Sequence, residues 1–94
     1  MFKIDFNVFN FLNDKEPKFT ILSEDYDEIV WNSYPHIAFK LLDGDDYLYY
    51  YGRLLCDKGW EHKYFEPLDD FGRGSSGCTS IEYYNRDYDI WEQV

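Results

Sequence analysis

The sequence predicts an α+β domain, an antiparallel β-sheet of about five strands with one short helix. Two observations carry this prediction. Apolar and polar residues alternate in several short runs separated by turn clusters, as in half-buried strands, and one stretch has apolar residues at helical spacing. The 94 residues contain no linker, repeat or low-complexity block, so residues 1–94 are expected to form a single domain.

The first two strands are expected before the helix. Residues 2–8 alternate between apolar and polar side chains. The alternation breaks over residues 9–12, which suggests a bulge, and residues 13–17 form a turn cluster that contains a proline. Phe19, Ile21 and Leu22 then fit a short return strand.

A short helix is predicted over residues 24–33. Ser23 is a good N-cap residue, and the acids that follow it lie where the helix dipole favours negative charge. Tyr26, Ile29, Val30 and Ser33 can share one face at helical spacing. Pro35 ends the segment, because the residue before a proline disfavours the helical conformation.

Residues 36–55 predict a β-hairpin. Apolar residues alternate over 37–41, an acidic turn follows at 43–46, and an aromatic run begins at Tyr47. The rest of the chain is predicted as a turn at 57–59, a strand over 60–65, a long glycine-rich loop over 66–77, and two strands over 79–84 and 88–91 around a turn at 85–87.

The chain combines strong acidity with a high aromatic content. Its 19 Asp and Glu against 9 Lys and Arg give a formal net charge of −10, while Phe, Tyr and Trp make up 22% of the residues. A disordered acidic segment is poor in aromatics, so this charge is expected on a folded surface. Such a fixed negative field repels nucleic acid and anionic lipid and attracts cationic partners.

The expected location is the cytoplasm. Asp5 falls where a signal peptide needs its apolar run, and no stretch approaches the roughly 20 apolar residues of a membrane span. Cys56 and Cys78 are too few for a disulfide scaffold and are expected to be free thiols, although one bridge between them stays open.

Residues 72–77 match the nucleotide-binding pattern G-x-G-x-x-G and the start of G-x-x-x-x-G-K-[ST]. These patterns bind phosphate through backbone N–H groups between a strand and a helix. Here a strand is expected after the motif, Cys78 stands where the lysine should be, and Asp69 and Asp70 repel phosphate. A plain flexible loop is therefore favoured over a nucleotide site.

No constellation supports catalysis or a metal site. The acids at 43–46 and 69–70 lack the EF-hand spacing, and the two histidines and two cysteines lack zinc-ligand spacing. A reactive thiol needs an electropositive setting, whereas Asp57 beside Cys56 and the negative field oppose ionisation. The prediction is a non-enzyme without a cofactor.

Acidic groups at 24–28, 43–46, 66–70 and 87–89 are the candidate binding surface. Rigid carboxylates can stand in for nucleic-acid phosphates, and neighbouring tyrosines can anchor a partner. Tyrosines can also stack on nucleic acid, but the net charge argues against direct contact with it. The alternative is a solubilising surface without a partner. The predicted partner-binding residues are Asp43, Asp45, Asp46, Asp69 and Asp70, then Glu24, Asp25, Asp27 and Glu28, with Tyr47, Tyr49 and Tyr51 as anchors.

One stretch carries a resemblance. Residues 64–72 (YFEPLDDFG), followed by Gly77-Cys78-Thr79-x-Ile81-x-Tyr83, resemble a segment of small uncharacterised acidic proteins carried on plasmids and other mobile elements. The resemblance covers about twenty C-terminal residues and implies no defined activity. In size and charge the chain is also similar to anti-CRISPR and anti-restriction inhibitors, some of which mimic DNA.

The function expected from these features is inhibition. The chain is predicted to bind and block a basic, nucleic-acid-handling host-defence protein by placing carboxylates in a groove that normally takes phosphates. One alternative is an immunity protein that neutralises a cognate toxin such as a nuclease. Another is a small enzyme or metal-binding protein that uses the 66–79 loop. Exposed tyrosines leave a homodimer open.

Overall fold

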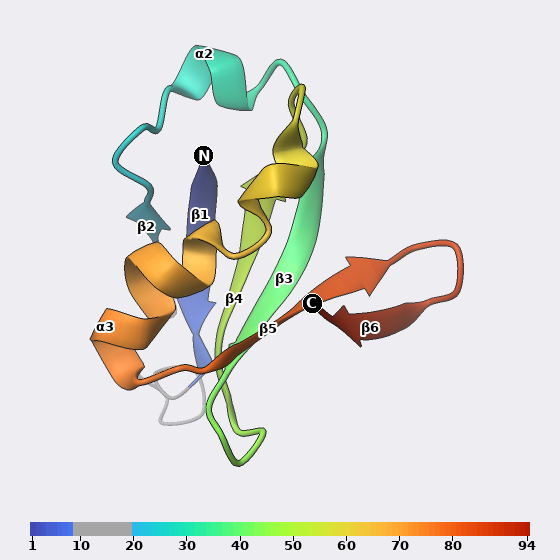
Figure 1. Cartoon of the computed structure of the whole chain (residues 1–94). Helices are drawn as coiled ribbons and strands as arrows, with labels where there is room; N and C mark the ends of the chain where they lie inside the picture. Colours follow the sequence, from blue (N-terminus) through green and yellow to red (C-terminus); the bar gives the residue numbers. More distant parts are fainter. Residues whose placement is uncertain (9–19) are drawn as a thin grey trace.

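The computed structural model describes residues 1–8 and 20–94, and these form one antiparallel sheet packed against a helical segment (Figure 1). The order of strands is β2-β1-β4-β3-β5-β6. The strands are β1 (Phe2–Asn7), β2 (Ile21–Leu22), β3 (His36–Leu42), β4 (Leu48–Leu55), β5 (Ser80–Asn85) and β6 (Ile90–Gln93), and the helical elements are α2 (Glu28–Trp31), η1 (Trp60–Lys63), η2 (Leu68–Gly72) and α3 (Arg73–Ser76). The predicted α+β class is confirmed.

The hairpin predicted over residues 36–55 is confirmed as the antiparallel pair β3–β4, and it lies at the centre of the sheet. Phe39 of β3 lies opposite Gly52 of β4, and Lys40 lies opposite Tyr51. A Cβ atom on Gly52 would lie 2.4 Å from the Phe39 ring and 2.4 Å from the Lys3 carbonyl oxygen of β1. Glycine at this position therefore lets a core ring and the neighbouring strand approach the β4 backbone closely.

Strand β1 pairs with β4 on one side and with the short β2 on the other. Ile4 lies opposite Gly52 and Ile21, and the register with β4 shifts between Ile4 and Phe6. The return strand is confirmed at Ile21 and Leu22. The bulge and turn predicted over 9–17, and Phe19, lie outside the described residues.

The predicted helix over 24–33 is shorter than expected, and its cap was assigned to the wrong residue. Helix α2 begins at Glu28, and the Asp27 carboxylate accepts hydrogen bonds from the N–H groups of Ile29 and Val30. Ser23 instead continues the sheet edge, where its N–H donates to the Phe2 carbonyl. The side chain that α2 buries is Trp31.

The predictions for residues 60–77 are wrong in both parts. The expected strand at 60–65 is a short 3-10 helix, η1, and the expected loop at 66–77 is helical as far as Ser76. Pro67 is tolerated because it lies in the first turn, where its missing N–H costs nothing. The segment ends at Gly77, which adopts a left-handed φ of 66°.

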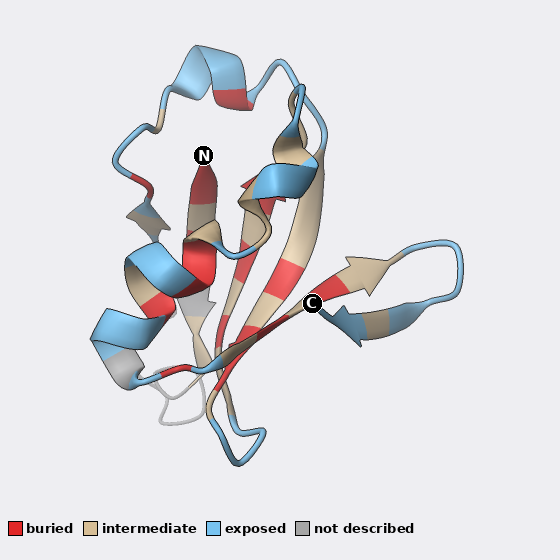
Figure 2. Cartoon of the chain, viewed as in Figure 1, coloured by how far each residue is buried: buried red, intermediate tan, exposed pale blue. Residues whose placement is uncertain are grey.

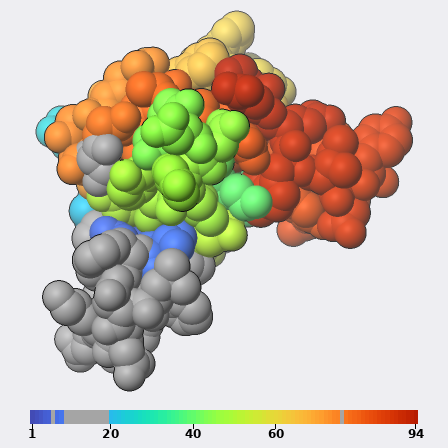
Figure 3. Space-filling view, turned by 90° about the horizontal axis from the view of Figure 1, so that it is seen from below, coloured from blue at the N-terminus to red at the C-terminus, as the bar shows by residue number. Residues whose placement is uncertain are grey.

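The last two strands are confirmed with small shifts in their bounds. Strands β5 and β6 form a hairpin around a turn at 86–89. Strand β5 pairs with β3 only over residues 80–83, and beyond this point the hairpin extends away from the body of the domain (Figures 1 and 3).

The helical segment 60–76 covers one face of the sheet, and the main core lies between them (Figure 2). The fully buried side chains of this core include Ile4, Phe39, Leu41, Leu54, Leu68, Cys78 and Ile81. A smaller cluster of Met1, Trp31 and Leu55 lies at the α2 end. Within the described residues, no helix is both long enough and apolar enough to cross a membrane.

Candidate functional site

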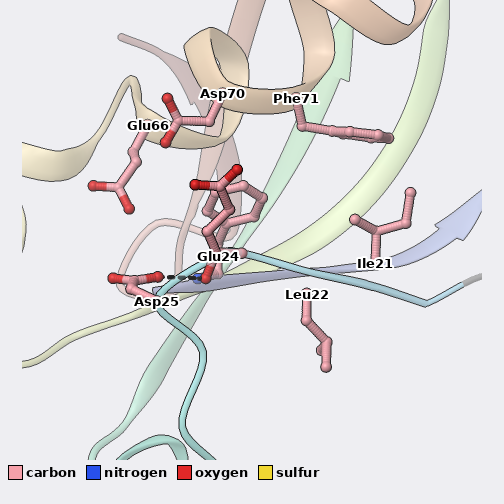
Figure 4. A pocket seen from close by; sticks show the side chains of 9 residues that line it. Ile21, Leu22, Glu24, Asp25, Glu66, Asp70 and Phe71 are labelled. Carbon is pink, nitrogen blue, oxygen red and sulfur yellow. Dashed lines mark hydrogen bonds between the residues drawn. The ribbon is translucent and has the colours of Figure 1, made fainter.

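A pocket of about 380 Å³ lies between the β2–α2 connection and the helical segment (Figure 4). Its walls combine an apolar side and an acidic side. Ile21, Leu22 and Phe71 lie on one side, and the carboxylates of Glu24, Asp25, Glu66 and Asp70 gather on the other, with Phe2 and Ser23 completing the lining. The pocket therefore brings together two acidic groups that lie some forty residues apart in the sequence.

The acidic side is built from the edge of the sheet. Buried Ser23 accepts a hydrogen bond at 2.9 Å from the N–H of Phe2, and its hydroxyl donates to Asp25 Oδ1 at 2.7 Å. These two bonds hold the turn that follows β2 against β1. The Asp25 carboxylate is consequently fixed at the pocket mouth.

The other two carboxylates of the acidic side come from the helical segment. Glu66 and Asp70 are four residues apart in a helical stretch, so their side chains project from the same face. The amino group of Met1 lies 3.3 Å from Asp25 Oδ2 and 3.4 Å from Glu66 Oε1. A single ammonium group can thus contact one carboxylate from the β2–α2 connection and one from the helical segment.

The Asp25 carboxyl has a pKa below its ordinary value. Partial burial would raise the pKa of this carboxyl, but the hydrogen bond from Ser23 and the positive charge of the amino group outweigh it and lower the pKa from 3.8. The ionised form is therefore the one that this environment stabilises.

The acids predicted first as the binding surface lie elsewhere. Asp43, Asp45 and Asp46 form the β3–β4 turn, at the end of the sheet away from α2 (Figure 1). The Asp43 carboxylate accepts hydrogen bonds from the N–H groups of Asp45 and Tyr47, at 2.9 and 3.0 Å. Asp43 thus closes the turn, which leaves Asp45 and Asp46 exposed beside it.

The three predicted tyrosine anchors have different surroundings. Tyr47 is 68% exposed next to the acidic turn. Tyr49 is half-buried against the core, and the negative charge of Asp43 raises its pKa. Tyr51 lies on the other face of the sheet, with its ring 6.2 Å from that of Trp91. The three side chains do not form one surface.

Among the other predicted acids, only some contribute to the pocket. Asp27 caps α2, Glu28 lies in its first turn, and Asp69 pairs with Arg73 at 3.0 Å on the exposed surface. Glu24, Asp25 and Asp70 line the pocket. The sequence grouped Glu66 with Asp69 and Asp70 as an acidic cluster but left it out of the selected partner-binding residues. The i, i+4 spacing of Glu66 with Asp70 would have favoured its selection had a helix been expected there.

The residues considered for nucleotide binding or nucleophilic chemistry are not arranged for it. The glycine motif of 72–77 runs through the end of a helix, so its first glycines do not form a phosphate-binding loop between strand and helix. Burial and the charge of Asp43 raise the pKa of the Cys78 thiol to about 11, and burial, Asp57 and Glu61 raise that of Cys56. Within the described residues, no group of three potential ligands could hold a metal ion.

Comparisons with protein-family models, with curated proteins and with solved structures found no match.

Proposed function

We propose that this chain is a binding protein that captures a basic segment of a nucleic-acid-handling protein and blocks the groove where nucleic acid would lie. The observation that carries the proposal is the pocket between β2 and the helical segment, where four carboxylates lie across from an apolar side formed by Ile21, Leu22 and Phe71. Two of these carboxylates already contact one ammonium group, the amino group of Met1, and this contact supports a pocket that accepts a cationic head. Arginine and lysine side chains have the matching form, an apolar stem with a cationic head.

The net charge of −10 supports capture of a basic partner. A uniform excess of one sign steers an oppositely charged protein toward the surface and raises the rate of association. The pocket then supplies the short-range contacts that steering alone lacks. Partly enclosed carboxylates pair more strongly with guanidinium groups than carboxylates in open solvent do.

The acidic β3–β4 turn is a second contact region in this proposal. Asp45 and Asp46 are exposed there beside Tyr47, and Asp43 makes the turn rigid. Aromatic side chains beside charged groups are frequent anchors at interfaces. A target of the host-defence class, in which arginines and lysines line a phosphate groove, matches both regions, and binding there would act as DNA mimicry.

The test compares two double variants that lose the same charge. Glu66→Gln with Asp70→Asn alters the pocket, and Glu61→Gln with Asp87→Asn removes two exposed acids outside it. Binding of a labelled arginine-rich peptide is followed by fluorescence anisotropy over a range of salt concentrations. The pocket variant should bind about tenfold more weakly at low salt, and the control variant less than about twofold.

Two outcomes would contradict the proposal. If both variants weaken binding equally, the peptide senses only the overall field and the pocket has no specific role. If neither weakens it, the pocket is not the site of capture. A pull-down from host lysate at low and high ionic strength then identifies the natural target, whose nucleic-acid binding should be lost when the wild-type chain is added.

A further inference from the structure

A second cleft opens where β5 separates from β3. The last residues paired between these strands are Phe39 and Tyr83, yet β3 continues back to His36 while the β5–β6 hairpin turns away (Figure 1). The cleft measures about 490 Å³. Its lining residues are His36, Ile37, Ala38, Arg53, Cys56, Trp60, Tyr84, Asn85 and Arg86.

The start of β3 presents backbone groups to this cleft. The Pro35 carbonyl accepts from the Cys56 N–H on the β4 side, and the Leu42 carbonyl accepts from the Thr79 N–H on the β5 side. Because successive residues of a strand direct their backbone groups to opposite edges, those of His36 point toward β5. The described strands provide no partner at that position, and such an edge is a template for an added strand.

The lining of the cleft differs in charge from most of the surface. None of the nine described residues that line it is acidic, in a chain with 19 acidic residues. The lining contains two arginines and a histidine. Arg53 uses Nε and Nη2 for Asp5, whereas no ion pair within the described residues engages Arg86.

The other walls are apolar and firmly held. Trp60 packs edge-on against Tyr64, with ring centroids 5.0 Å apart, and Tyr84 packs against Trp91 at 5.3 Å. The His36 ring stacks on Trp31 at 4.0 Å, and its Nε2 lies 2.7 Å from the Trp31 carbonyl oxygen. These contacts predefine the shape of the cleft, which reduces the entropic cost of filling it.

We propose that the cleft binds an extended, acidic peptide segment of a partner protein. The segment adds to the edge of β3 next to His36, and one of its carboxylates pairs with Arg86. Backbone hydrogen bonds of an added strand supply affinity, and the alternating side chains supply selectivity. The site is separate from the acidic pocket and prefers the opposite charge, so it does not depend on the function proposed above.

The probe is a short peptide of alternating valine and glutamate with blocked ends, titrated into the ¹⁵N-labelled full chain. Two analogues accompany it, one with glutamine in place of glutamate and one with N-methyl groups along one edge. The expected result is saturable shifts of the backbone amides of residues 36–38 and 84–86. Both analogues should bind at least about fivefold more weakly, because the glutamine peptide loses the charge that pairs with Arg86 and the N-methylated peptide loses backbone N–H donors.

Variants separate this site from the rest of the surface. Arg86→Gln should weaken binding of the glutamate peptide about tenfold, whereas Arg73→Gln, which removes an exposed arginine from α3, should leave it unchanged. The pocket variant with Glu66→Gln and Asp70→Asn should also bind the peptide normally. The amide spectrum of each variant reports its folding in the same experiment.

The proposal is overturned if no saturable shifts appear at residues 36–38 and 84–86. If the glutamate and glutamine peptides bind equally, an ionic contact between the peptide and the cleft is excluded. If the N-methylated peptide binds as well as the unmodified one, addition of a strand to β3 is excluded. An unchanged affinity in Arg86→Gln excludes the assigned carboxylate partner.

Discussion

Arg53 of β4 and Asp5 of β1 form a two-point ion pair across neighbouring strands, with Nε–Oδ2 and Nη2–Oδ1 distances of 2.9 and 2.8 Å. The pair lies on the face of the sheet opposite the helical segment, where the Arg53 guanidinium is also 5.6 Å from the centre of the Trp31 ring. The hydrogen bonds to Asp5 raise the pKa of Arg53. One side chain thus joins two strands and the α2 region.

Replacing Arg53 by lysine should destabilise the fold modestly. Lysine keeps the charge but cannot form the two parallel hydrogen bonds or stack its planar group on the indole. Because Arg53 is 42% and Asp5 28% exposed, water screens the pair, and the expected loss is about 0.5–1 kcal/mol in the free energy of unfolding. Urea unfolding of Arg53→Lys, Asp5→Asn and the double variant measures the coupling, and strictly additive losses would show that the pair contributes nothing.

Gly52→Ala should be among the most destabilising single changes. The new methyl group would overlap the Phe39 ring and the Lys3 carbonyl oxygen, both 2.4 Å away, and the backbone oxygen cannot move aside without shifting β1. The expected loss is about 2–4 kcal/mol.

Gly74→Ala is the matched control for this prediction. Its Cβ would meet no atom within 4 Å, and the position is helical, so a gain of about 0.5–1 kcal/mol is expected. Thermal unfolding of both variants tests the pair. Loss of stability in Gly74→Ala would contradict the helical assignment of the glycine motif.

The contribution of Asp25 should depend on pH with a definite sign. Its folded-state pKa is lower than 3.8, so the stabilisation it provides is present above that pH and disappears as the pH falls through the folded value. The difference in unfolding free energy between wild type and Asp25→Asn should therefore shrink on acidification. Asp87→Asn, an exposed acid in the β5–β6 turn, serves as the control. A difference that stays constant down to about pH 2 would rule out the assigned environment.

The two thiols should differ in their reaction with iodoacetamide. Cys78 is buried in the main core with a pKa near 11, while Cys56 is only half-buried. Intact-mass measurements of the native protein at about pH 8 should show slow modification of Cys56 and none of Cys78. Adding denaturant should expose both. Modification of Cys78 in the native state at the rate of an open thiol would contradict its position in the core.

The strands were predictable where the alternation of residues along the strand and the residue types of the adjoining turn indicated the same structure. The β3–β4 hairpin has large apolar residues at alternate positions of β3 (Ile37, Phe39 and Leu41) and a turn at Asp43 whose carboxylate accepts hydrogen bonds from the following N–H groups, which is the local preference of aspartate. Both features depend on residues that are close in sequence, so distant contacts in the folded chain do not override them. The β5–β6 hairpin follows the same rule around Asn85, whose side chain accepts from Asp87 N–H.

The helical segment was not predictable from composition, because Gly72, which looks like a loop residue in the sequence, serves close packing instead. Gly72 lies inside the helix where a Cβ would be 3.2 Å from both Cys78 Cβ and a Leu41 methyl group, so the helix approaches the sheet more closely than a larger residue allows. In the sequence, Gly72 indicates a loop, because a local pattern holds no information about packing against a strand that is distant in the chain. Because the helical segment was not expected, the acidic pocket was not predicted either, since Glu66, Asp70 and Phe71 of this segment line it.

The order of strands also affects how the chain folds during synthesis. Phe2 pairs with Leu54, and among the described residues β1 has the two-residue β2 as its one earlier neighbour until β4 has left the ribosome. An apolar edge thus stays open until the residues of β4 have been made, and pairing between such distant segments is slow. The acidic residues scattered along this early portion would keep unfinished chains apart by mutual repulsion until the central strand arrives.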